Sequence, residues 1–222
     1  GAMAGGEPVG YLADYPIYGQ VAGVNAFALG MQMVDPRARV LLEWSSVGGH
    51  EEAEKRLLDR GVRLISSQDL TRWGRDESES GRVNLATPLW QWGTYYERLL
   101  RLVRSNSAKQ EYAGTSRALN YYWGLSAGVV DLRYNETLPP SVIRLAETLK
   151  NAVRSGLCHP FAGPLYNQDG KAIETDGDLT PEQIIRMEEL MENIDGSIPV
   201  YNELTDLAKA TVDMVGVDKA RG

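Results

Sequence analysis

The chain has 222 residues, and its hydrophobic fraction of 43% is large enough for a folded core rather than a disordered chain. Its formal net charge of −7 argues against a nucleic-acid partner, because phosphate binding depends on clustered Lys and Arg. The single cysteine, Cys158, has no second cysteine for an internal disulfide, and no apolar run approaches the roughly 20 residues of a membrane-spanning helix.

The first 69 residues alternate between the patterns of strands and helices. In chain order we expect a strand at 8–16, a helix at 17–34, a strand at 38–46, a helix at 49–61 and a strand at 62–69. Val21, Val24 and Phe27 illustrate the helical spacing, and the second strand is a nearly continuous apolar run, as when both faces are covered. This order predicts an α/β fold with a parallel doubly wound sheet.

The pattern changes after Asp69. We expect, in order, a polar loop at 71–84, an extended segment at 85–90, a helix at 94–106, a strand at 123–134, a helix at 139–156, two extended pieces within 158–173, and helices at 181–192 and 201–215. Thr180 is the expected N-cap of the helix at 181–192. The helix at 139–156 carries an apolar stripe that we expect to be buried.

Aromatic and polar side chains follow the predicted strands. In open α/β sheets, ligands bind outside the carboxyl ends of the strands. The candidate ligand-binding residues there are Asp14, Tyr15, Trp44, Gln68, Asp69, Trp90, Gln91 and Trp92. Aromatic faces with amide and carboxylate groups suit a flat, polar heterocycle, which stacks on the rings and is read at its edge. The alternative is a core role, since alternation places Trp90 and Trp92 on one side of an extended segment.

Catalytic and metal sites find little support in the sequence. His50 and His159 have no Cys or His partner at metal-ligand spacing. No nucleophile elbow and no phosphate-binding loop is present. We therefore expect no catalytic residue, no metal and no cofactor.

Four stretches together resemble the BMP family, the basic membrane lipoprotein (Med/PnrA-like) substrate-binding proteins of ABC transporters. They are the opening segment at 9–40, "TPLWQWGTYYERLL", "GLSAGVVDL" and "SGLCHPFAGPLYNQDGK", and "GSIP" at 196–199 matches the end of the domain. Gln91 stands where the family usually has Asn. The likeness runs from about Gly10 to Pro199, and the combination is more specific than any one piece.

The resemblance implies a type I periplasmic-binding-protein-like lobe that contributes one wall of a cleft for a purine nucleoside or base. It also implies an ABC permease as partner, a first lobe that this chain lacks, and an extracytoplasmic location, periplasmic or lipoprotein-anchored. Residues 1–6 look like the remnant of a tag. We expect the ligand-binding lobe at 7–199 and a C-terminal helical tail at 200–222, with the tail packing on the absent lobe.

The resemblance also gives individual roles. Trp90 would lie beside the base, Gln91 and Trp92 would shape the wall, Tyr15 would lie near the hinge, and Gln68 and Asp69 would make polar contacts. No counterpart of the family's ribose-binding aspartate is found, so ribose recognition stays open. Two other functions also stay open: a ligand-sensing domain of a larger regulatory protein, and a nucleoside hydrolase, which would need an acid–base pair that the sequence lacks.

Overall fold

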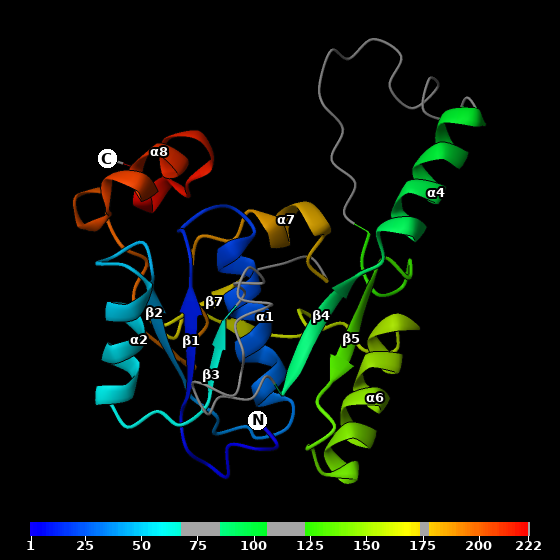
Figure 1. Cartoon of the computed structure of the whole chain (residues 1–222), viewed down its shortest axis with the longest axis horizontal. Helices are drawn as coiled ribbons and strands as arrows, with labels where there is room; N and C mark the ends of the chain where they lie inside the picture. Colours follow the sequence, from blue (N-terminus) through cyan, green and yellow to red (C-terminus); the bar gives the residue numbers. More distant parts are fainter. Residues whose placement is uncertain (68–84, 106–122, 174–177, 222) are drawn as a thin grey trace. The chain divides into compact units, whose positions relative to one another are not determined.

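The computed structural model describes residues 1–67, 85–105, 123–173 and 178–221 (Figure 1). Its chain divides into two compact units: unit 1 is formed by Gly1–Arg75 and Pro160–Gly222, and unit 2 by Asp76–His159. The ligand-binding lobe expected at 7–199 includes residues of both units. Local periodicity carries no information on which strands pair, and pairing decides this division.

Unit 1 is built on a parallel four-stranded sheet in the order β3-β1-β2-β8. The strands are β1 (Val9–Ala13), β2 (Val40–Trp44), β3 (Ile65–Ser67) and β8 (Ile194–Asp195). The first three come from the predicted β-α-β-α-β segment, and β8 is a two-residue strand that the sequence did not predict. The predicted parallel α/β sheet is confirmed.

Helices cover both faces of this sheet, which accounts for the apolar character of β1 and β2 (Figure 1). Helix α1 (Gln20–Gln32) packs on the face that carries Tyr11, and the Tyr11 and Phe27 rings meet edge to face with centroids 5.0 Å apart. Helix α2 (His50–Asp59) packs on the opposite face, where Leu57 contacts the cluster containing Leu12.

The C-terminal residues belong to the same core. The elements are β6 (Leu165–Tyr166) antiparallel to β7 (Ala172–Ile173), α7 (Pro181–Ile185), η2 (Tyr201–Glu203), α8 (Asp206–Val215) and η3 (Asp218–Ala220). Val212 and Val217 are fully buried in the cluster that also contains β1 and α1. The expected tail at 200–222 therefore packs on unit 1 itself.

Two predicted helices are shorter than expected. Thr180 is the N-cap of α7 as predicted, and its hydroxyl accepts from the Gln183 N–H in a capping box, but α7 ends at Ile185. The predicted helix at 201–215 is split, since the Thr205 hydroxyl caps a new helix by accepting from the Ala208 N–H.

Buried asparagines tie α1 to the segment around β8. The Asn25 side chain is fully buried, donates to the Glu189 carbonyl at 2.8 Å and accepts from the Met191 N–H at 3.1 Å. Asn193 donates to the Ala28 carbonyl at 2.9 Å. The Asn25 bonds give partners to the Glu189 carbonyl and the Met191 N–H, which would otherwise lie unpaired beside an apolar core.

The described part of unit 2 contains a two-stranded antiparallel sheet and two helices. Strand β4 (Ala86–Trp90) pairs with β5 (Val130–Tyr134), and the helices are α4 (Trp92–Arg104) and α6 (Pro140–Arg154). Neither helix has a fully buried residue. The stripe of the helix predicted at 139–156 is thus only half-buried, with Leu145 39% exposed.

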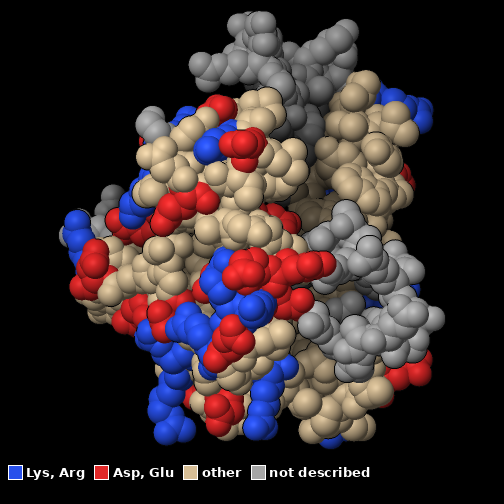
Figure 2. All heavy atoms as spheres, turned by 60° about the vertical axis from the view of Figure 1, so that its left-hand side comes forward, with Lys and Arg blue, Asp and Glu red and all other residues tan. Residues whose placement is uncertain are grey.

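Charge is mixed over the surface drawn in Figure 2, where basic side chains stand beside acidic ones. Among the described residues, no helix combines the length and apolarity needed to cross a bilayer.

Candidate ligand-binding site

Trp90 and Trp92, two of the candidate ligand-binding residues, lie at the surface of unit 2. Trp90 is 50% exposed and Trp92 53% exposed. Their rings are stacked, with centroids 6.0 Å apart and planes inclined by 22°. The sequence left two roles open for these rings, stacking on a ligand and packing in a core. Rings that are half exposed are not packed in a core.

Further aromatic side chains extend this pair into what we call the aromatic surface, formed by Trp90, Trp92, Tyr95, Tyr96 and Trp123. Tyr96 is 57% exposed and lies 6.2 Å from Trp92, with ring planes inclined by 31°. Tyr95 meets Trp92 edge to face at 5.8 Å and Trp123 at 5.4 Å. In the aromatic surface, the planes of Trp90 and Tyr96 are therefore inclined by 22° and 31° to that of Trp92, and Tyr95 contacts Trp92 edge to face.

The local chain path explains this arrangement. Strand β4 ends at Trp90, and Gln91 leaves the extended conformation with φ −84° and ψ 70°. The Gln91 N–H donates to the Val129 carbonyl at 2.8 Å, which fixes the turn against β5. Helix α4 begins at Trp92, so Trp92 and Tyr96 lie one helical turn apart on the same face.

A pocket of about 350 Å³ lies beside this turn, within unit 2. Its lining consists of Gln91, Thr94, residues 125–128, Val130, Asp131 and Arg154. Gln91 lines it and neither tryptophan does. Of the candidates at 90–92, Trp90 and Trp92 therefore belong to the aromatic surface, and Gln91 belongs to the pocket.

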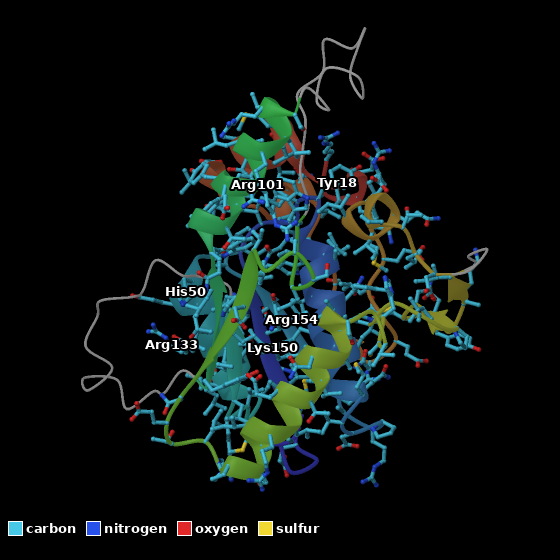
Figure 3. The ribbon with its side chains drawn as sticks, turned by 90° about the vertical axis from the view of Figure 1, so that its right-hand side faces the viewer. Tyr18, His50, Arg101, Arg133, Lys150 and Arg154 are labelled. Atoms are coloured by element: carbon cyan, nitrogen blue, oxygen red, sulfur yellow. The ribbon has the colours of Figure 1, made fainter. Side chains whose placement is uncertain are left out.

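An ionic cluster forms the polar wall of this pocket. The Lys150 side chain is only 8% exposed, and its ammonium donates to Asp131 Oδ1 at 2.9 Å and contacts Glu147 Oε1 at 2.6 Å. Arg154 Nη2 lies 3.5 Å from Asp131 Oδ1. Figure 3 shows Lys150 and Arg154 projecting next to each other from α6. The Lys150 hydrogen bond, followed by one from the Leu132 N–H, lowers the pKa of the Asp131 carboxyl, so Asp131 is an ionised acceptor.

The remaining described candidates belong to unit 1. Asp14 follows β1, and its carboxylate accepts from the Ser45 hydroxyl at 3.2 Å, at the carboxyl ends of β1 and β2 as predicted. Tyr15 is partly buried and packs against the main core cluster. Trp44 is 4% exposed, and its indole N–H donates to the Ser197 carbonyl at 2.8 Å, so the ring is part of the core.

Gln68 and Asp69 lie outside the described residues. The structure brings Trp90, Gln91 and Trp92 together in unit 2 and Asp14, Tyr15 and Trp44 together in unit 1. The expected position of Trp90 at the rim of the parallel sheet is corrected, because β4 belongs to the antiparallel pair β4–β5.

Sequence reasoning did not select Tyr95, Tyr96, Trp123, Asp131 or Arg154. Tyr96 carried a usable signal, since it lies four residues after Trp92 and within the helix predicted at 94–106. Asp131 and Arg154 carried none, because they meet only through the packing of α6 beside β5. Among the described residues, no group of three or more His, Cys, Asp or Glu side chains is arranged to hold a metal ion.

No protein-family model matches the chain. A purine-binding protein of Brucella abortus is 27% identical over 217 residues, which cover 86% of this chain and 58% of that protein. A putative ABC transporter glucose-binding protein of Haloferax volcanii is 24% identical over 219 residues, covering 90% of this chain and 52% of that protein.

The chain is similar in sequence to these two binding proteins. The resemblance to BMP-type substrate-binding proteins predicted from the sequence is confirmed, and both relatives are named for binding. The chain spans a little over half the length of these binding proteins.

Proposed function

We propose that this solute-binding chain serves an ABC transporter and binds a purine nucleoside or base, with the planar base stacked on the aromatic surface. The observation that carries the proposal is the exposure of two stacked indole rings, 50% and 53%, on a folded unit. Exposed tryptophans forfeit the hydrophobic gain that rings of this size usually obtain by burial, so a flat ligand that covers them is stabilising.

A purine fits this surface better than a purely polar solute. Each purine has a π face that stacks on indole, worth about 1–3 kcal/mol per base in nucleic-acid complexes. The name of the Brucella relative supports a purine, and Gln91 between the two tryptophans supplies an amide for a base edge. The proposal includes transport rather than catalysis, an extracytoplasmic location held by a lipid anchor or in the periplasm, and a permease partner.

Isothermal titration with adenosine, guanosine and adenine tests this proposal. The variant Trp90→Ala should weaken purine binding by at least tenfold, or about 1.4 kcal/mol, because one stacking face is lost. Leu100→Ala is the matched control: it removes a 63% exposed apolar side chain from α4 outside the aromatic surface and should leave the affinity unchanged. Equal affinity of Trp90→Ala and the unmodified chain would remove the aromatic surface from the site.

A further inference from the structure

The polar wall of the unit 2 pocket holds hydrogen-bonding groups that the fold does not use. All the contacts of the Asp131 carboxylate with other described residues fall on Oδ1, from Lys150, from the Leu132 N–H and from Arg154. Oδ2 has no such contact within the described part of the chain. Arg154 is 40% exposed and makes a single, long contact, so most of its guanidinium donors are available.

Neutral side chains around this pair are also available. Gln91 precedes α4 but forms no side-chain cap, and the hydroxyls of Thr94 and Ser126 have no hydrogen-bond partner among the described residues. Each of these groups both donates and accepts. The pocket therefore offers acceptors and donors close together without a fixed pairing.

Charge decides which ligand chemistry fits. The two ionised groups that line the pocket, Asp131 and Arg154, have opposite charges. The Asp131 carboxylate would therefore repel a free anion, and the Arg154 guanidinium would repel a free cation. Lys150 lies behind Asp131, holds Oδ1 and shares its charge with Glu147, so it is a positioning residue. A hydroxyl group is uncharged, donates to a carboxylate and accepts from a guanidinium, and two neighbouring hydroxyls satisfy both partners at once.

We infer that this pocket recognises the hydroxyl groups of a sugar, either free or as the sugar of a nucleoside, through Asp131 and Arg154. Its volume of about 350 Å³ lies at the lower end of the range of about 300–1,000 Å³ for small-molecule sites, as a single sugar ring requires. The inference does not depend on what stacks on the aromatic surface, because neither tryptophan lines the pocket.

Nuclear magnetic resonance of the nitrogen-15-labelled chain tests it with D-ribose, D-glucose, adenosine and adenine at millimolar concentration. At least one of the three sugar-containing probes should shift the backbone amide signals of Gln91, Thr94 and Gly128. Asp131→Asn should weaken that binding at least tenfold, since the acceptor loses its charge and half its acceptor capacity. Arg154→Gln, at a more exposed position, should do the same with little effect on folding, and Glu97→Gln on the outer side of α4 should have no effect.

The outcomes separate this inference from the proposed function. If ribose or glucose shifts the pocket amides and no purine binds, the pocket stands and the purine proposal fails. If adenosine and adenine bind equally and no pocket amide moves, the purine proposal stands and the sugar pocket is overturned. Sugar-induced shifts that persist at full strength in both Asp131→Asn and Arg154→Gln would also overturn it.

Discussion

At the scale of single residues, the chemistry of unit 2 depends on how Lys150 holds Asp131. A lysine only 8% exposed needs compensating charge, and it has two carboxylates within 3 Å. Hydrogen bonds to Glu147 and Asp131 raise the pKa of Lys150, and the reciprocal bond lowers the pKa of Asp131. Both groups therefore stay charged at neutral pH.

This arrangement predicts how Asp131 titrates. In an unfolded chain an aspartate has a pKa of about 3.9. Because the folded value is lower, the carboxylate stabilises the fold at pH values above 3.9, and that contribution is lost as pH falls through the folded value. Lys150→Met should raise the pKa of Asp131 towards 3.9, as measured from its carboxyl carbon-13 shift against pH. Arg101→Gln, whose partner is Glu97 on α4, is the control and should not change it; an unchanged pKa in Lys150→Met would contradict the assignment.

At the scale of secondary-structure elements, the end of α8 depends on a close approach at Gly216. The Val217 N–H donates to the Pro16 carbonyl at 3.0 Å, so the chain turns back directly onto the loop after β1. A side chain at position 216 would come within 2.5 Å of the Val212 carbonyl oxygen. This position therefore has no room for a methyl group.

Gly216→Ala should lower the free energy of unfolding by about 1–3 kcal/mol, the usual cost of overpacking. Gly30→Ala is the matched control, because it lies inside α1 with no atom near the new methyl group. That change should instead stabilise the chain by about 0.5–1 kcal/mol through helix propensity. Urea denaturation followed by circular dichroism measures both, and equal stability of the two variants would show that Gly216 is not sterically constrained.

The elements that the sequence predicted are those whose pattern is local. The segments β1 to β3 with α1 and α2 were found from apolar spacing, and the Thr180 cap from its position before Pro181. Strand β8 was missed because two residues are too short for any periodicity, and the sequence pattern did not mark the end of α7 at Ile185. The pairing of β4 with β5 joins residues about 40 positions apart, which no short window records.

At the scale of the whole molecule, the candidate ligand-binding residues belong to two different units of the fold. The rings at 90 and 92 lie exposed as the ligand-binding interpretation requires, while Trp44 is part of the core of unit 1. Gln91 and Trp92 were expected to shape one wall, whereas Gln91 lines a pocket that neither tryptophan lines. Asp131 and Arg154 could not be predicted, since their proximity arises from tertiary packing alone.

The most direct test of a purine stacked on the aromatic surface is to follow the indole N–H signals of the nitrogen-15-labelled chain while adenosine is added. The account predicts that the Trp90 and Trp92 signals shift, because ring currents from a stacked base act on both. The Trp44 signal should stay in place, since that indole is buried and bonded to the Ser197 carbonyl. If millimolar adenosine leaves the Trp90 and Trp92 signals unmoved, the aromatic surface does not bind purines and the proposed function is contradicted.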